Sequence, residues 1–511
     1  MKTLSAIAAV ILLLAFQTLG LEAQHFPPTQ ELELLLRYMV EDGEAPAVVL
    51  GVLEPDGSTR LATWYEPDAT RGDGRSVFEL GSVTKTFTAT LLTEMVLNGD
   101  VRFEDPVERY LPEGVRVPSA GGRRITLLDL ATHRSALPAF PPELERVGPD
   151  GLEEPYTWED AYSFLEEYEL PWAPSTRRRY SSFGYGLLGH ALGTALGTTY
   201  REALRTRVLE PLGMETAMFS GEHAEDVRVI LGHRSGQPVR PRSNVEVLDG
   251  SGALRASGED MVKFLAANVG PPEGRVEEAM RSAHAIQGRR DARGGGQGLA
   301  WGTSVFPGQS PVVGHSGSTI GFRSHIAFAP ERGIGAVLLS NDNGFSDSEL
   351  ATTLLFMDPV PSSWATEQKL PVTESFAGTY EPLSGNGRIY IRLEEEGWLT
   401  YQPPGKARTR LYSRSDSSFY MLRGPWTLTF RDDPDGSTRL TMAVDQREPS
   451  QEGVTREFRK VAAGTPSPTS VASHAGLSSR RGFPVWFFGG LVLAAGLIAA
   501  VFARRRLDAS V

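Results

Sequence analysis

The sequence contains no cysteine. That absence excludes disulfide bridges, thiolate metal sites, a cysteine nucleophile and a lipid-modified N-terminal cysteine. The formal net charge of -12 at pH 7 leaves no basic footprint, which argues against nucleic acid as a partner. No metal or other cofactor is expected, because the 511 residues hold no His-Glu-x-x-His cluster and no glycine loop of the phosphate-binding form.

Lysine is also scarce, since only six of the 51 Lys and Arg residues are lysines. Arginine cannot lose its proton, whereas a buried lysine can have its pKa lowered enough to accept one. Only Lys85 follows a serine by three positions, in the stretch FELGSVTKTF of residues 78–87. Ser82 and Lys85 are therefore candidates for a nucleophile and its base.

The local pattern supports this pairing. Gly81 permits a tight turn, and the apolar spacing after it predicts that Ser82 opens a helix, with Lys85 one turn along the same face. The helix N-terminus would stabilise a developing alkoxide on Ser82 and disfavour a charged Lys85. In the alternative interpretation, Ser82 is a simple N-cap and Lys85 is solvated.

The two ends of the chain carry long apolar runs. Residues 1–23 read as a secretory signal peptide, with Lys2 before the apolar run and a small residue at the end. Residues 483–503 contain no charged residue and include the 19-residue run 485–503. They precede a tail of residues 504–511 that begins with three arginines. We expect a transmembrane helix, with this tail in the cytoplasm and the rest of the chain periplasmic or extracellular. A buried core helix and a sorting tail that is later removed are the alternatives.

Residues 24–362 predict an α/β domain. Residues 28–43 have the apolar spacing of a helix, and residues 45–66 read as two strands around a Pro-Asp-Gly turn. A long helical region follows, and strands return between residues 298 and 341. Strands at both ends with helices between them predict one antiparallel sheet flanked by helices, with a helical subdomain beside it.

Residues 370–461 have a different pattern: short segments in which apolar and polar residues alternate are separated by turn residues. This pattern predicts a small all-β barrel or sandwich domain. Residues 462–482 read as a flexible linker to the membrane segment.

Two further segments make the Ser82 motif more specific. Residues 180–189 read YSSFGYGLLG, and residues 314–318 read GHSGS. Together with FELGSVTK, and in this order, they resemble the motifs of the serine β-lactamase and penicillin-binding protein family, and most closely its class C β-lactamases with their D,D-peptidase and esterase relatives. The resemblance covers about residues 30 to 345.

The resemblance implies a serine hydrolase that forms an acyl-enzyme with an amide, β-lactam or ester substrate, either a small molecule or derived from peptidoglycan. Ser82 would be acylated, and Lys85 and Tyr180 would move its proton. The backbone N–H groups of Ser82 and Ser318 would form the oxyanion hole. The substrate-binding positions implied by the same motifs are Ser182, His315 and Gly317.

Two of these positions depart from the family pattern. Ser182 stands in place of an asparagine, and His315 stands in place of a lysine. His315 would hold a substrate carboxylate only as an imidazolium, so we expect affinity for carboxylate substrates to fall as the pH rises. Both changes favour small esters or D-amino-acid amides over β-lactams. They also keep open a penicillin-binding D,D-peptidase-like protein and a non-catalytic cell-surface binding module.

GHSGS has a second interpretation, as an altered nucleophile elbow that would make Ser316 the nucleophile of an α/β-hydrolase. That motif needs a glycine where Ser318 stands and a helix after the serine, whereas the following residues have the texture of a strand. His133, in the middle of the helical region, is expected to be a buried structural histidine.

Overall fold

The computed structural model describes residues 24–66, 73–147, 156–224, 227–239, 245–288, 290–305, 309–345, 350–356, 374–384, 387–404, 406–421, 426–444 and 455–463. The expected signal peptide, linker, transmembrane helix and cytoplasmic tail lie outside these residues. Among the described helices, none combines the length and the apolar character that crossing a bilayer requires.

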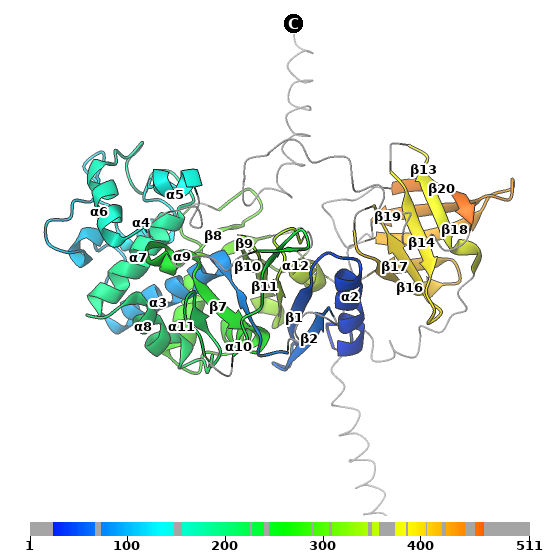
Figure 1. The fold of residues 1–511 in the computed structure, drawn as a ribbon, viewed down its shortest axis with the longest axis horizontal. Coiled ribbons are helices and arrows are strands. Elements are labelled where there is room, and N and C mark those ends of the chain that lie inside the picture. Colours follow the sequence, from blue (N-terminus) through cyan, green and yellow to red (C-terminus); the bar gives the residue numbers. More distant parts are fainter. Residues whose placement is uncertain are drawn as a thin grey trace, which may run out of the picture. The chain divides into compact units, whose positions relative to one another are not determined.

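The centre of the fold is an antiparallel sheet of seven strands in the order β2-β1-β12-β11-β10-β9-β8. Its strands are β1 (Ala47–Leu53), β2 (Thr59–Tyr65), β8 (Gly296–Gln297), β9 (Gly302–Ser304), β10 (Val312–Ser318), β11 (Arg323–Ala329) and β12 (Ile334–Ser340). Strand β1 pairs with β12, so that Val48 lies opposite Ser340. The prediction of one sheet built from the two ends of the domain is confirmed (Figure 1).

Both faces of this sheet are covered at its centre, because strands β1 and β12 are apolar and fully buried. On one face Val48, Leu50 and Leu338 form a core with α2 (Thr29–Glu41) and α12 (Leu350–Leu355). On the other face Val49 and Leu339 join the larger core of the helical subdomain. Residues that alternate along a strand point to opposite faces, so the fully buried strands β1 and β12 serve both cores.

The helical subdomain lies between β2 and β8 in the sequence. Its helices are α3 (Thr84–Asn98), α4 (Leu127–Ala131), α5 (Pro142–Val147), α6 (Trp158–Glu167), α7 (Ser182–Ala195), α8 (Tyr200–Leu204), α9 (Asp249–Gly252), α10 (Gly258–Val269) and α11 (Arg275–Ala283). Shorter helical elements are η1 (Gly81–Val83), η2 (Val107–Tyr110), η4 (Arg205–Leu209) and η5 (Glu246–Leu248). A small sheet has the strand order β3 (Val77–Glu79), β7 (Leu254–Ser257), β4 (Met218–Phe219). A second small sheet pairs β5 (His233–Arg234) with β6 (Gln237–Pro238). Threonines at the N-caps of α4 and α6 form capping boxes with aspartates three residues on, which explains where these two helices begin.

Residues after 373 form a closed antiparallel barrel of eight strands, which confirms the predicted all-β domain. The strands are β13 (Gly378–Pro382), β14 (Ile389–Leu393), β15 (Leu399–Gln402), β16 (Thr409–Ser415), β17 (Ser418–Met421), β18 (Trp426–Asp432), β19 (Thr438–Val444) and β20 (Thr455–Ala463). Strand β13 pairs with both β14 and β20 and so closes the barrel. Apolar side chains such as Ile391, Leu428 and Leu440 alternate into its core.

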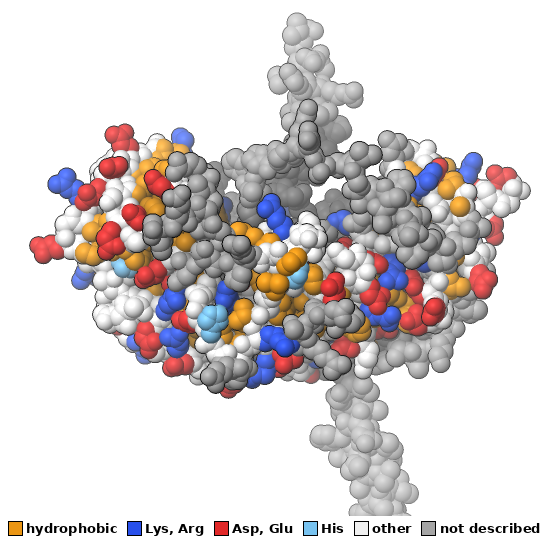
Figure 2. Space-filling model, in the orientation of Figure 1, with side chains coloured by type: hydrophobic (Ala, Val, Ile, Leu, Met, Phe, Trp, Pro, Cys, Tyr) orange, Lys and Arg blue, Asp and Glu red, His pale blue; other side chains and the backbone are white. Residues whose placement is uncertain are grey.

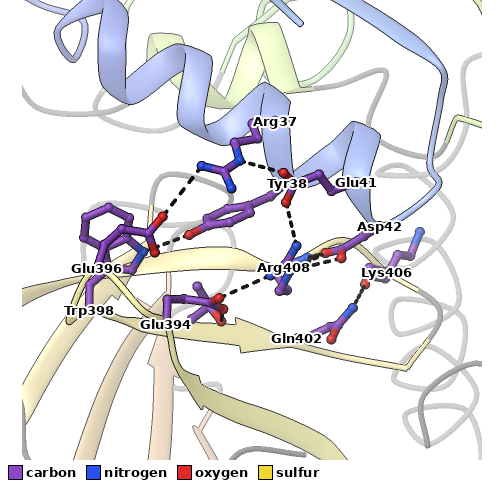
Figure 3. A network of polar contacts seen from close by, with 11 residues as sticks. Arg37, Tyr38, Glu41, Asp42, Glu394, Glu396, Trp398, Gln402, Lys406 and Arg408 are labelled. Atoms are coloured by element: carbon purple, nitrogen blue, oxygen red, sulfur yellow. Dashed lines mark hydrogen bonds and ion pairs between the residues drawn. The ribbon is translucent and has the colours of Figure 1, made fainter. Parts of the chain in front are cut away.

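The barrel contacts helix α2 through a polar network (Figure 3). Arg408 donates to Asp42 at 3.0 Å and to Glu41 at 2.9 Å, and it also bonds Glu394 of the barrel. The indole of Trp398 donates to the Tyr38 hydroxyl at 2.8 Å. Farther along α2, Arg410 bonds Glu31 at 2.8 Å. Glu31 and Glu41 of α2 and its C-cap Asp42 are therefore paired with arginines of the barrel.

The described surface carries charges of both signs. On the face shown in Figure 2, Asp and Glu side chains are interspersed with Lys and Arg side chains. This mixture agrees with the absence of a basic footprint in the sequence.

Candidate active site

Ser82 lies in a short turn, η1, that leads directly into helix α3. Gly81 has φ +48°, a conformation that L side chains rarely adopt, and a Cβ there would lie 2.7 Å from the backbone oxygen of Ser318. The turn therefore requires glycine both for its backbone conformation and for the close approach of β10. The expectation that Ser82 opens a helix is confirmed.

Lys85 is fully buried one turn after Ser82. Its Nζ donates to Ser82 Oγ at 3.2 Å, to Ser182 Oγ at 3.3 Å and to the carbonyl of Ser251 at 2.7 Å. Three oxygens thus fix the amine against the nucleophile candidate. The alternative of a solvated Lys85 is wrong, because no part of this side chain reaches the surface.

Tyr180 approaches Ser82 from the segment that precedes helix α7. Its hydroxyl donates to Ser82 Oγ at 2.8 Å, and Lys85 Nζ lies 5.0 Å from the centre of its ring. Ser82 Oγ therefore has two titratable neighbours within proton-transfer distance. The structure brings together Ser82, Lys85, Tyr180 and Ser182, although they come from segments about 100 residues apart.

His133 positions Tyr180. It is buried, its ring lies 4.4 Å from the Tyr180 ring, and its Nδ1 accepts the N–H of Ser181 at 3.1 Å. Burial lowers the pKa of His133 well below its usual value, so the imidazole is neutral and can accept this bond. The expectation of a buried structural histidine is confirmed.

Strand β10 packs against the turn that carries Ser82. A Cβ on Gly317 would lie 2.0 Å from the Leu80 carbonyl oxygen, so only glycine fits there. The Ser324 hydroxyl of β11 donates to the same carbonyl at 2.7 Å. The Cβ position of Gly81 is 2.8 Å from the backbone nitrogen of Ser318, which places that nitrogen next to the turn. The last residue of β10 is thus held against the turn that carries Ser82.

His315 is buried on β10, with 2% of its surface exposed. Burial, and to a smaller extent the positive charge of Lys85, lower the pKa of His315 to about 3. The expectation that an imidazolium at this position holds a carboxylate near neutral pH is therefore wrong. The sequence pattern did not reveal this burial, because it arises only when the chain has folded.

Ser316 faces the opposite side of β10. Its hydroxyl bonds His325 Nδ1 at 2.6 Å, and His325 Nε2 bonds the Thr352 hydroxyl of α12 at 2.7 Å. Ser316 lies inside a strand, not before a helix, which contradicts the nucleophile elbow. The hydroxyl belongs to a polar contact between the sheet and α12.

Among the described contacts of the site, sequence reasoning missed the Ser251 carbonyl that accepts from Lys85. It lies in the short helix α9, whose glycines pack closely on α7: a Cβ on Gly250 would be 2.4 Å from the Tyr185 carbonyl oxygen. Any residue can supply a backbone carbonyl, so no side-chain motif marks it. In the sequence, this close packing is indicated only by the two glycines at positions 250 and 252 on either side of Ser251.

Comparison with known proteins agrees with this geometry. The family model described as Beta-lactamase matches residues 32–356. A "Beta-lactamase" of Escherichia coli K12 is 27% identical over 340 residues, which cover 60% of this chain and 86% of that protein. The "D-alanyl-D-alanine-carboxypeptidase/endopeptidase AmpH" of the same organism is 28% identical over 280 residues, or 52% of this chain and 70% of that protein.

Solved structures share the fold. The octameric penicillin-binding protein homologue from Pyrococcus abyssi aligns with a TM-score of 0.54 at 21% identity, over 84% of this chain and 99% of its own. A class C beta-lactamase aligns with a TM-score of 0.54 at 22% identity, over 64% of this chain and 95% of its own. The family match covers more than half of the chain and includes Ser82, Lys85 and Tyr180. The chain belongs to the beta-lactamase family of serine hydrolases.

Proposed function

We propose that the protein hydrolyses ester or amide bonds through an acyl-enzyme on Ser82. The observation that carries this proposal is the contact of one serine oxygen with two proton-transfer groups, Lys85 Nζ at 3.2 Å and Tyr180 OH at 2.8 Å. A serine hydroxyl is a weak nucleophile until a neighbouring base takes its proton. Lys85 and Tyr180 are positioned to act together as that base.

In the first step Ser82 Oγ bonds to the substrate carbonyl carbon while its proton passes to the Lys85–Tyr180 pair. The carbonyl oxygen becomes an oxyanion, which the N–H groups of Ser82 and Ser318 stabilise. Collapse of this intermediate breaks the bond to the leaving nitrogen or oxygen, which receives the proton from the same pair. A water molecule then attacks the acyl-enzyme by the reverse sequence, which releases the acid and restores Ser82.

The substrate preference follows from the two altered positions. Ser182 bonds Lys85 and has no amide to donate to an acyl side chain, and His315 is neutral at the pH of the assay. Both changes remove features that suit penicillins. Small activated esters or D-amino-acid amides are therefore the proposed substrates, in preference to β-lactams.

The test uses the full chain with 4-nitrophenyl acetate, nitrocefin and a fluorescent penicillin. Turnover of the ester that Ser82→Ala abolishes supports the proposal, and intact-mass analysis should then locate a transient adduct on Ser82. A lasting penicillin adduct would instead indicate a penicillin-binding D,D-peptidase-like protein. Wild-type ester turnover that persists in Ser82→Ala, or no adduct with any of the three compounds, contradicts the proposal.

The pH dependence of carboxylate binding follows from His315. Its pKa of about 3 keeps the ring neutral at every pH from 5.5 to 8, so titration of this ring cannot alter substrate binding in that range. We expect a flat KM for a carboxylate-bearing ester from pH 5.5 to 8. A His315→Lys variant tests the same point, because a cation there should lower that KM. A KM in the wild type that rises more than threefold over this range would contradict the assignment.

The barrel is not part of the proposed chemistry. The hydrogen bonds described for Ser82 and Lys85 join them to Tyr180, Ser182 and Ser251, all in the hydrolase domain, whereas the barrel bonds α2. We expect a chain ending near Ser362 to keep ester turnover within about tenfold but to unfold at a lower temperature, because Glu31 and Asp42 lose their arginine partners. In the full chain, Arg408→Gln should lower Tm while Arg431→Gln, an exposed barrel position, should not. A folded truncated chain without any turnover would show that the barrel contributes to the site.

The proposed location is the outer side of the cell membrane, with residues 483–503 as a single C-terminal span. This part of the proposal rests on the apolar run of the sequence and the three arginines that follow it. Protease added to intact cells should release a fragment that ends within residues 462–482. Recovery of the full-length protein in the soluble cytosolic fraction would contradict this location.

A further inference from the structure

A groove of about 540 Å³ is lined by arginines from three separate segments. Arg178 comes two residues before Tyr180, Arg134 follows His133, and Arg290 lies in the turn before β8. The turn is held to its neighbours by the Gln287 N–H, which donates to the Gln297 carbonyl at 2.7 Å. Arg134 is thus adjacent to the histidine that packs on Tyr180, and Arg178 lies two residues before Tyr180 itself.

The charges of this groove do not cancel. Its lining has three arginines and one acid, Asp291, whose Oδ1 accepts the N–H groups of Arg293 at 2.8 Å and Gly295 at 2.9 Å. Within the described part of the chain, no Asp or Glu lies at ion-pair distance from any of the three guanidinium groups. Acids outnumber bases in this sequence by 63 to 51, so an uncompensated group of arginines is unexpected.

The guanidinium groups also have hydrogen-bond capacity to spare. Arg178 Nη2 donates to Gln297 Oε1 at 3.1 Å, and Arg290 Nη1 donates to the Gly294 carbonyl at 2.8 Å. Each guanidinium has five N–H donors, so one bond leaves most of them for a ligand. Arg134 and Arg178 line the same groove and carry charges of the same sign. Like charges so placed repel each other, and an anion between them would relieve that repulsion.

We propose that this groove binds an anionic group, a carboxylate or another oxyanion, of the substrate that acylates Ser82. The inference rests on the proposed function and specifies its substrate class: esters or amides that carry a negative charge near the scissile bond. Arginine suits this role because its planar fork can bond both oxygens of a carboxylate or phosphate. Arg178 stands two residues before Tyr180, and Arg134 directly follows His133, so the groove would supply a cation close to the site, where neutral His315 does not.

The kinetic test uses the full chain and two 4-nitrophenyl esters, of N-acetylglycine and of N-succinylglycine, of which only the second carries a carboxylate. We expect kcat/KM to favour the succinyl ester by about tenfold at low salt. Arg178→Gln or Arg290→Gln should reduce this preference about fivefold, since exposed charge pairs are worth about 1 kcal/mol each. Arg178→Lys should retain part of it, and 0.5 M NaCl should weaken it.

The matched control is Arg431→Gln, which removes one exposed arginine from the barrel and should leave both rates unchanged. If neither groove variant alters the preference, or if the wild type shows none, the proposal is overturned while the acyl-enzyme chemistry stands. A third ester with a phosphonate in place of the carboxylate distinguishes the two kinds of anion.

A binding measurement separates this inference from the proposed function. Calorimetric titration of the full chain with N-succinylglycine, and separately with inorganic phosphate, does not depend on turnover. Saturable binding that weakens at least fivefold in Arg178→Gln supports the groove even if no ester is hydrolysed. No binding of either compound up to 10-mM concentration, on the order of the weakest affinity that such contacts give, overturns it.

Discussion

Replacing Lys85 with arginine is expected to lower kcat for ester hydrolysis by about 10²- to 10⁴-fold, the range that a positioned proton-transfer group contributes. Arginine keeps the positive charge but cannot release a proton, so it cannot help to deprotonate Ser82. The pocket is also closed, because Lys85 is fully buried and already bonds three oxygens. The measurements are 4-nitrophenyl ester turnover and the thermal unfolding of each variant.

Lys263 provides the matched control for this variant. It is a half-exposed lysine whose Nζ lies 3.5 Å from an Asp260 oxygen, so Lys263→Arg keeps its charge and its surroundings. We expect Lys263→Arg to retain full turnover. A Lys85→Arg protein that folds and keeps more than a tenth of wild-type kcat would show that Tyr180 alone, or another group, accepts the serine proton.

Replacing Gly317 with alanine is expected to lower kcat by about 10²- to 10³-fold, the loss that follows from removing one oxyanion donor. The added methyl group would lie 2.0 Å from the Leu80 carbonyl oxygen and 2.4 Å from the Ser324 hydroxyl. Strand β10 must therefore move away from the turn that carries Ser82. Since Ser318 ends the same strand, its N–H would move away from the substrate oxygen.

Ser316→Ala is the control for the Gly317 variant. Ser316 is the adjacent residue of β10, but its hydroxyl bonds His325 on the side of the sheet that α12 covers. This variant should keep kcat within threefold and lose about 1 kcal/mol of stability, the usual value of one hydrogen bond. A large loss of kcat in Ser316→Ala would indicate that Ser316 is the nucleophile instead of Ser82. Normal turnover in a folded Gly317→Ala would contradict the proposal that β10 holds an oxyanion donor.

Much of the fold could be predicted from the sequence, because local patterns encode it. The helix over residues 28–43 and the two strands after it show their periods directly, and the structure has α2, β1 and β2 in that region. Strands are predicted to return at residue 298, but of the described residues 298–305 only Gly302–Ser304 form a strand, β9. Residues just before it form a turn in which Ala300 has φ 63° and Trp301 is buried, so tertiary packing overrides the apolar pattern.

The site was predictable only in part. The scarcity of lysine marks Lys85, and its spacing from Ser82 indicates the pair, but Tyr180 was found through the family resemblance alone. The pKa of His315 depends on its burial and on Lys85, which comes close only after folding. The arginine groove likewise forms only when segments near residues 134, 178 and 290 meet. A sequence pattern shows neither how deeply a histidine ring is buried, which sets its pKa, nor which charged side chains line a cavity after folding.

The pairing of β1 with β12 also affects how the chain folds during synthesis. Val48 and its partner Ser340 are separated by nearly the whole hydrolase domain. At about 5 to 20 residues per second, the ribosome needs about 15 to 60 seconds to make the chain between them. Over that time β1 and β2 can form a hairpin, but the other edge of β1 has no native partner and is open to wrong pairing. The central sheet can therefore be completed only after the nearly 300 residues between β1 and the end of β12 have been made, and until then the domain is only partly folded.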